Sequence, residues 1–380
     1  MEKLKHNINE ILHKFSYFVR KNAVLCIAAV LALVTCFIIP PDGEYIGYFD
    51  FKTLSCLFAT LAVIGALRNI SFFTILARSI VKKTGTLRMA VFALVFITFF
   101  GSMLIANDMA LLTFLPLGYY VLSSTGRTEI MAYTFILQNI AANLGGMLTP
   151  FGNPQNLYLY TKFEIDNIEF MGIMLLPFIV ATVVIAVCCL FVKNEKIELK
   201  ENYTRSLSLP KTVFYLALFV LSIVMVFRVI PYWAGLLIIL IALLITDRKA
   251  VIGVDYGLLM TFICMFIFAG NMSRIDLIKD FLSSLLEVNT LIFSALSCQV
   301  ISNVPSAVLL SQFTDNYAEL LRGVNIGGTG TLIASLASLI TFREFTRHNP
   351  KKTASYVLLF SALNFGFLIL LLILCSIFPA

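Results

Sequence analysis

Long apolar stretches recur along the whole chain, separated by short polar segments. They are continuous rather than alternating, which predicts membrane-spanning helices and not the strands of a barrel. The lengths of these stretches predict about nine full crossings, together with two pairs of shorter segments. The crossings are expected at residues 22–40, 51–67, 128–161, 168–192, 212–229, 231–247, 251–270, 324–342 and 353–377.

Each pair of shorter segments is interpreted as a re-entrant hairpin whose tip reaches the middle of the membrane. The pairs are 89–106 with 109–122 and 288–301 with 304–314. Segment 304–314 is too short to span a bilayer, whereas 89–106 would reach about 27 Å as a helix. The alternative is therefore two full crossings with a surface turn between them. An amphipathic, interfacial stretch precedes each pair.

Composition places the chain among integral membrane proteins. Of its 380 residues 59% are hydrophobic and only 13% are charged, against about a quarter charged in a soluble domain. The first apolar run follows a basic leader, but it ends in Pro40-Pro41 without a cleavage site, which favours a crossing over a signal peptide. The expected class is an all-α polytopic membrane protein.

The cysteine and histidine residues argue against a metal-dependent membrane enzyme. The eight cysteines lie within apolar runs and the three histidines in polar flanks, and no H-E-x-x-H motif occurs. No cofactor and no metal other than Na⁺ is expected. The net charge of +7 does not indicate a nucleic-acid partner, because topology explains it better.

Lys and Arg residues set the orientation. With the tail 1–21 in the cytoplasm, 22 of the 28 basic residues fall inside and 6 outside, as the positive-inside rule requires. The second large basic group is a cytoplasmic linker, 193–211. This path predicts a plasma membrane protein, the inner membrane in a bacterium, with a cytoplasmic N-terminus and an external C-terminus.

The two halves resemble each other in reverse orientation. Residues 22–192 form the first predicted repeat and 231–378 the second, with 212–230 as a bridging helix. Asp50 opens a helix from outside and Asp255 the corresponding helix from inside, and "NLGGMLTPFGNPQN" corresponds to "NIGGTGTLIAS". Inverted repeats with interrupted helices are the architecture of secondary transporters.

Polar residues occupy the hairpin tips. The first tip reads Ala106-Asn107-Asp108 and the second reads Ser302-Asn303-Val304. A carboxyl group within a membrane is costly and usually functional. Asp108 is therefore interpreted as a proton carrier or Na⁺ ligand, the alternative being a helix N-cap in a hydrated turn.

The crossing that contains TPFGNPQN is predicted to be broken. Residues 129–156 would extend about 42 Å as one helix, more than the hydrocarbon core of about 30 Å. A break within 143–154 removes the excess, and Asn153-Pro154 reads as an N-cap followed by proline at the first helical position. In the second half Gly327, Gly328 and Gly330 break the chain, and Thr329 or Thr331 is expected to cap the next helix.

Four helix starts that converge in this way would bind an anion without a buried arginine. The residues expected to bind substrate are Asn107, Thr149, Gly152, Asn153, Asn156, Ser302, Asn303, Asn325, Gly328 and Thr329. The residues expected to couple an ion are Asp108, Asn143, Asn107 and Asn303. Asn153 and Asn156 are expected to face the substrate.

The motifs "AND", "SNVP" and "TPFGNPQN" resemble those of the ion transporter superfamily, most of all its citrate transporter-like group, over almost the whole chain. Anion symporters of this superfamily carry Ser-Asn-Thr at each tip, and only Ser302-Asn303 matches. An Asn-Asp tip is similar to the arsenite permease and NhaD-type antiporter branches. The resemblance implies a homodimer with a fixed scaffold and moving transport domains.

The sequence thus predicts a secondary transporter for a small anion, either citrate or dicarboxylate-like or an inorganic oxyanion, coupled to Na⁺ or H⁺. The alternatives are a cation/proton antiporter that uses Asp108 and an arsenite permease. A membrane enzyme or scaffold is disfavoured.

Overall fold

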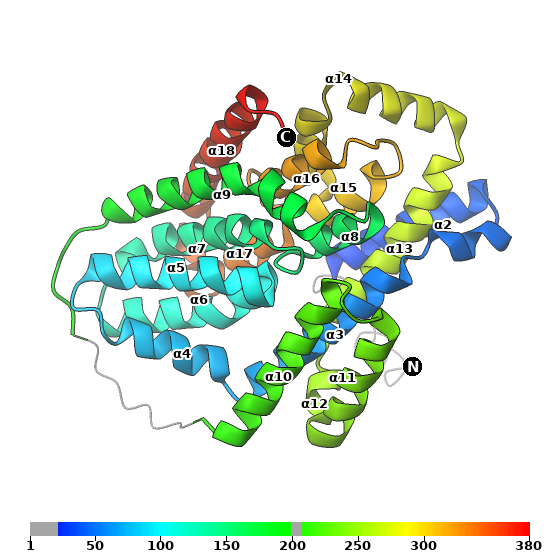
Figure 1. Ribbon diagram of the computed structural model, residues 1–380. Helices are drawn as coiled ribbons and strands as arrows, with labels where there is room; N and C mark the ends of the chain where they lie inside the picture. Colours follow the sequence, from blue (N-terminus) through cyan, green and yellow to red (C-terminus); the bar gives the residue numbers. More distant parts are fainter. Residues whose placement is uncertain (1–21, 199–206) are drawn as a thin grey trace, which may run out of the picture.

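The computed structural model describes residues 22–198 and 207–380, which are overwhelmingly helical (Figure 1). The expected tail 1–21 and part of the linker 193–211 lie outside the described residues. Seven of the described helices are long and apolar enough to cross a membrane. Together with the shorter apolar helices, they confirm an all-α polytopic membrane protein.

The helices are divided here into two groups, which meet where α13 packs on α15 and α3 packs on α8 (Figure 1). The first, here called the scaffold bundle, consists of α2 (Ala23–Ile38), α3 (Phe51–Asn69), α10 (Leu209–Val226), α11 (Tyr232–Thr246), α12 (Arg248–Ile252) and α13 (Tyr256–Ser273). The second, the hairpin bundle, consists of α5 (Leu87–Ile105), α6 (Asn107–Ser124), α7 (Met131–Gly145), α8 (Pro154–Lys162), α9 (Asn167–Leu190), the second half of α14 (Asp276–Ile301), α15 (Asn303–Leu310), α16 (Tyr317–Ile326), α17 (Leu336–His348) and α18 (Thr353–Ile377).

Two amphipathic segments connect the bundles, as the sequence predicts. The first is α4 (Phe72–Val81). The second is the start of α14, which a kink at Asn289 (φ −165°, ψ 95°) separates from the following hairpin leg. Short 3₁₀ turns complete the chain: η1 (Gly43–Tyr48), η2 (Thr128–Ile130), η3 (Gly146–Leu148) and η4 (Pro350–Lys352).

Both predicted pairs of segments form helical hairpins, α5–α6 and α14–α15, with their legs packed together. At Gly101 on α5, an added Cβ would lie only 2.5 Å from the ring of Phe114 on α6. Glycine at this position therefore permits the close approach of the two legs.

The predicted helix breaks are present too. α7 ends at Gly145, η3 follows, and α8 begins at Pro154, so the TPFGNPQN stretch interrupts the helix and is largely buried. In the second half the chain is irregular between α16 and α17. Asn153 stands at the N-cap position of α8, but its side chain makes no capping hydrogen bond there.

The expected cap of α17 is wrong. Ser335, not Thr329 or Thr331, caps this helix by accepting a hydrogen bond from the Ala337 N–H. The two threonine hydroxyls are used elsewhere, because Thr329 donates to the Ile326 carbonyl and Thr331 to the Gln299 carbonyl. The glycine-rich segment thus continues as turns beyond both threonines.

Candidate functional site

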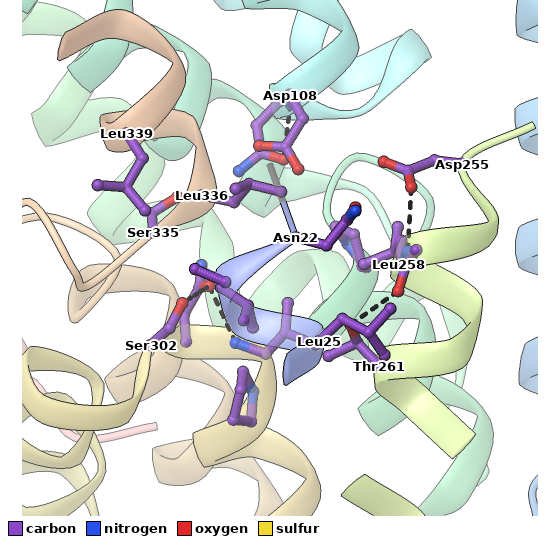
Figure 2. A pocket seen from close by; sticks show the side chains of 18 of the residues that line it. Asn22, Leu25, Asp108, Asp255, Leu258, Thr261, Ser302, Ser335, Leu336 and Leu339 are labelled. Atoms are coloured by element: carbon purple, nitrogen blue, oxygen red, sulfur yellow. Dashed lines mark hydrogen bonds between the residues drawn. The ribbon is translucent and has the colours of Figure 1, made fainter. Parts of the chain in front are cut away.

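The two hairpin tips and the starts of α8 and α17 meet at one cavity of about 90 Å³, called here the central cavity (Figure 2). Asn107 and Asp108 come from the first tip, and Ser302 and Asn303 from the second. The opposite wall belongs to the scaffold bundle, where α2 and α13 contribute Asn22–Leu25, Asp255 and Thr261. The cavity therefore lies between the bundles.

The two tips have the same backbone geometry. Ala106 (φ 64°, ψ 150°) and Ser302 (φ 75°, ψ 156°) both have positive φ, which is costly for residues other than glycine. In each tip the next asparagine accepts, on Oδ1, the N–H of the residue after it: Asp108 N to Asn107 and Val304 N to Asn303, both at 2.9 Å. Each tip thus holds an asparagine in a fixed position.

Asn143 on α7 joins the first tip to the second break. Asn107 Nδ2 donates to Asn143 Oδ1 at 3.1 Å, and Ser335 Oγ donates to the same oxygen at 2.8 Å. The second tip is held in turn by a hydrogen bond from Asn303 N to the Ala334 carbonyl at 2.9 Å. The tips and breaks therefore form one connected polar unit.

Asn156 holds the first break together. Its Nδ2 donates to the carbonyls of Gly146, Met147 and Thr149 at 3.1–3.3 Å. Asn325, on α16 of the second half, donates to Asn156 Oδ1 at 2.6 Å. This fully buried side chain joins the two breaks and lies behind the cavity wall.

Asn153 also lies behind that wall, so the structure places neither Asn153 nor Asn156, both expected to face the substrate, in the lining of the central cavity. Asn153 Nδ2 donates to the Asn143 carbonyl and to Asn325 Oδ1. The reason is that the unwound backbone exposes carbonyl groups, which these amides satisfy because water cannot reach them.

Of the expected site residues, four line the cavity: Asn107, Asp108, Ser302 and Asn303. The others are Asn143, Thr149, Gly152, Asn153, Asn156, Asn325, Gly328 and Thr329, which the structure places outside its lining. Sequence reasoning missed Gln155, Asp255, Thr261, Ser335 and Arg343, which do line it. Asp255 had a signal, since it opens its helix as Asp50 does, whereas nothing in the sequence marks Thr261.

Six helices begin at the cavity: α6, α8, α15 and α17 of the hairpin bundle, and α2 and α13 of the scaffold bundle. Their free N–H groups and dipoles favour negative charge there. Two carboxyl groups also line the cavity, Asp108 from the first tip and Asp255 from the scaffold bundle (Figure 2). When ionised, they counteract the positive potential of the helix N-termini. Asp255 caps α13 through the Leu258 N–H at 3.0 Å, whereas Asp108 Oδ1 accepts no hydrogen bond from the described residues.

Uncommitted oxygens also occur beside the cavity. The amide oxygens of Asn153 and Gln155 are buried and accept no hydrogen bond from the part of the chain that the structure describes. Side-chain and main-chain oxygens of unwound helices are the ligands that transporters offer to Na⁺. Among the described residues, no cluster of histidine, cysteine and acidic side chains has the composition of a transition-metal site.

Comparison with known proteins gives a consistent result. A family model described as citrate transporter matches residues 11–322. An uncharacterized transporter of Methanocaldococcus jannaschii is 34% identical over 77% of this chain and 81% of its own length. The inner membrane protein YbiR of Escherichia coli K12 is 27% identical over 77% and 80%. A silicon efflux transporter of Oryza sativa subsp. japonica is 31% identical over 40% and 30%.

Proposed function

Because the chain belongs to the citrate transporter family, we propose that it is a secondary active transporter for a small anion of the carboxylate or oxyanion class. The observation that carries the proposal is the convergence of six helix N-termini, four of them from the hairpin bundle, on one cavity between two bundles. Such a cavity attracts negative charge through backbone groups and orients the solute through Asn107, Ser302 and Asn303.

Coupling to H⁺ or Na⁺ is part of the proposal. Asp108 faces the cavity as a titratable group beside the proposed anion site, so it would carry a proton together with, or in exchange for, the solute. The uncommitted oxygens of Asn153 and Gln155 favour Na⁺ as the second possibility. Either ion would offset the charge of an anion that crosses the membrane.

The transport cycle is proposed to be a movement of the hairpin bundle against the scaffold bundle, which would form the homodimer contact. In the orientation that the basic residues predict, the central cavity lies toward the cytoplasm. The supporting observation is that both tips, and the starts of α8 and α17, belong to the hairpin bundle, so the whole polar unit can move together.

A second candidate is an exporter of a weak acid or a cation/proton antiporter. Two carboxyl groups, Asp108 and Asp255, line the central cavity, and they disfavour a strongly charged anion. The partial likeness to a silicon efflux transporter agrees with a neutral, hydroxyl-rich solute held by amides and hydroxyls. Arsenite, as the uncharged acid, belongs to the same class.

Reconstituted proteoliposomes test these functions. Uptake of radiolabelled citrate, succinate and arsenate is measured with an imposed Na⁺ or pH gradient, and Asn303→Ala serves as the site variant. Concentrative uptake of one anion, lost in Asn303→Ala, supports the first function. Na⁺-driven proton movement in the absence of any added anion would contradict anion transport and support a cation/proton antiporter.

A further inference from the structure

A second cavity lies at the far end of the helices that line the central one. Three helices begin at the central cavity or its wall and end at this second cavity: α8, α13 and α15. α13 contributes Asp255 and Thr261 at one end and Gly270 and Ser273 at the other. The second cavity, of about 360 Å³, is called here the η1 pocket because Tyr48 at the end of η1 forms part of its wall.

A packed layer separates the two cavities. The hydroxyl groups of Tyr158 on α8 and Ser311 after α15 are 2.8 Å apart, and the Tyr158 ring packs on Phe262 and Phe266 of α13. Gln312 extends the contact, because its Nε2 donates to the Tyr158 hydroxyl at 3.4 Å. This layer closes the route from the central cavity to the η1 pocket.

Lys162, the last residue of α8, brings a positive charge to the η1 pocket. It is partly buried, and its Nζ donates to Gln312 Oε1 at 3.1 Å. No carboxylate lies within ion-pair distance of Lys162 among the described residues. A second lysine, Lys52, and two acids, Asp50 and Glu164, also line the pocket. Asp50 binds Thr53 through both oxygens. A half-buried ammonium group with only an amide partner favours an anionic ligand.

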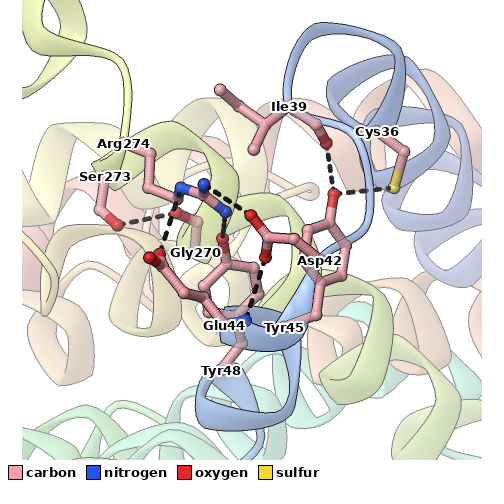
Figure 3. A network of polar contacts seen from close by, with 9 residues as sticks. All are labelled: Cys36, Ile39, Asp42, Glu44, Tyr45, Tyr48, Gly270, Ser273 and Arg274. Atoms are coloured by element: carbon pink, nitrogen blue, oxygen red, sulfur yellow. Dashed lines mark hydrogen bonds and ion pairs between the residues drawn. The ribbon is translucent and has the colours of Figure 1, made fainter.

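A neighbouring cation outside the pocket lining, Arg274, is already neutralised (Figure 3). Arg274 binds Asp42 at 2.7 Å, the Tyr48 hydroxyl at 3.0 Å and Glu44 at 3.4 Å. The hydrogen bond from Arg274 lowers the pKa of Asp42, so this pair is charged at neutral pH. Tyr48 also packs on Gly270, where an added Cβ would lie 2.5 Å from the ring. Arg274 therefore holds the pocket wall in place, and the two lysines of the lining, Lys162 and Lys52, remain for a ligand.

We propose that the η1 pocket is a second anion-binding site, in which the Lys162 ammonium group holds a carboxylate or oxyanion on the opposite side of the packed layer from the central cavity. The site rests on the proposed anion transport and deepens it, because it gives the solute a binding place at each end of its path. An anion bound there would take Lys162 from Gln312 and thereby loosen the contact between Gln312 and Tyr158.

The test measures charge selectivity inside the pocket. Ser273→Cys places a thiol in the pocket wall, where the native hydroxyl bonds only to the Gly270 carbonyl of its own helix. Purified protein is treated with an anionic sulfonate-bearing and a cationic ammonium-bearing methanethiosulfonate, and unmodified protein gives the background of the native cysteines. We expect the anionic reagent to react about tenfold faster, relative to free thiol, a ratio equivalent to about 1.4 kcal/mol, and citrate or sulfate to protect the thiol.

Lys162→Gln in the same background should remove both the preference and the protection, while Lys162→Arg should keep them. The exposed Lys279→Gln on α14 is the matched control and should change neither. A Ser273→Cys thiol that prefers the cationic reagent, or one that citrate and sulfate leave unprotected, overturns the second site. Protection of a Ser335→Cys thiol in the central cavity is measured in parallel, so failure of the η1 pocket is distinguished from failure of anion transport itself.

Discussion

The two hairpin tips share a backbone but differ in chemistry. Ala106 and Ser302 have nearly the same positive φ, and each is followed by an asparagine that accepts the next N–H. The third residue differs, since it is Asp108 in one tip and Val304 in the other. The geometry that presents polar groups to the cavity is thus duplicated, whereas the titratable group is not.

The same contrast extends to the ends of the scaffold helices. η1, just before α3, is held to the end of α13 by the ion pair between Asp42 and Arg274. Before α13, Asp247 accepts a hydrogen bond at 2.9 Å from Asn69 at the end of α3. In each half, the segment that precedes the first scaffold helix is therefore bonded to the end of a scaffold helix from the other half. Only the contact between Asp42 and Arg274 is an ion pair. A contact of this kind thus occurs in both halves, and the ion pair makes the halves distinct.

The largest expected effect comes from making the tips alike. Asp108→Val should abolish solute accumulation driven by a pH gradient, because the cavity loses the carboxyl group that the first tip contributes. Val304→Ala, at the equivalent position, should reduce uptake only modestly. Proteoliposome uptake measures both, with the Tm as a check on folding. Unchanged pH-driven uptake by Asp108→Val would contradict the unequal roles of the tips.

The second prediction compares the two side chains that donate hydrogen bonds to the free carbonyl groups of the helix breaks. Asn156 does this in the first half, and Gln299 in the second, where its amide donates to the Gly327 and Thr329 carbonyls and accepts from Thr331 N. Asn156→Ala should cost about 2–4 kcal/mol of stability, since it leaves several buried groups unsatisfied.

Gln299→Ala should cost less than Asn156→Ala, because Gln299 is only partly buried and water can replace some of its bonds. Thermal unfolding of the two purified variants in the same detergent measures the difference. Equal losses of Tm in the two variants would contradict this difference and would show that the two helix breaks are equally inaccessible to water.

A third, smaller effect concerns backbone strain. Ala106→Gly should stabilise the protein by about 0.5–1 kcal/mol, because glycine adopts positive φ without steric cost. Ser302→Gly should gain less, since it also loses the Ser302 Oγ contact with the Ala334 carbonyl at 3.3 Å. Tm values of both variants measure this, and a loss of stability in Ala106→Gly would contradict a strained tip.

The smallest effect is a pH dependence of the contact between Asp42 and Arg274. The pKa of Asp42 is lowered by Arg274, so its contribution to stability is present above about pH 4, the ordinary range of a carboxyl group, and is lost as pH falls through the lowered value. Wild type and Arg274→Gln should differ slightly in Tm at pH 6 and converge toward pH 3. The Asn69→Ala variant tests the contact between Asn69 and Asp247. If its Tm difference from wild type also vanished at pH 3, the two halves would respond to pH alike.

The sequence predicts the framework well because the framework depends on local signals. Apolar length identified the helices, and the Asn153-Pro154 pair marked the start of α8. The break in the second half was found from its glycines, but its cap was misplaced by several residues. Ser335 is preceded by turns that no local rule anticipates, since Gln299 on another helix holds them.

The orientation of the buried polar side chains was harder to predict from the sequence. Unwound polar residues were expected to face a solute, yet Asn153 and Asn156 satisfy carbonyls of the same break and pair with Asn325. Which of two adjacent amides turns inward depends on the packing of α8 against α16, and Gln155 is the one that reaches the cavity. A single sequence carries no information about that rotation.

The pairing of Asn156 with Asn325 has a consequence for biogenesis. The two residues are 169 positions apart, so Asn156 reaches the bilayer long before its partner is translated. At about 5–20 residues per second this delay is roughly 10–30 s. During that interval the first break must remain hydrated or shielded within the insertion machinery. The nascent chain therefore completes its polar interior only near the end of synthesis, and chains truncated before Asn325 expose an unfinished membrane interior to quality-control proteases.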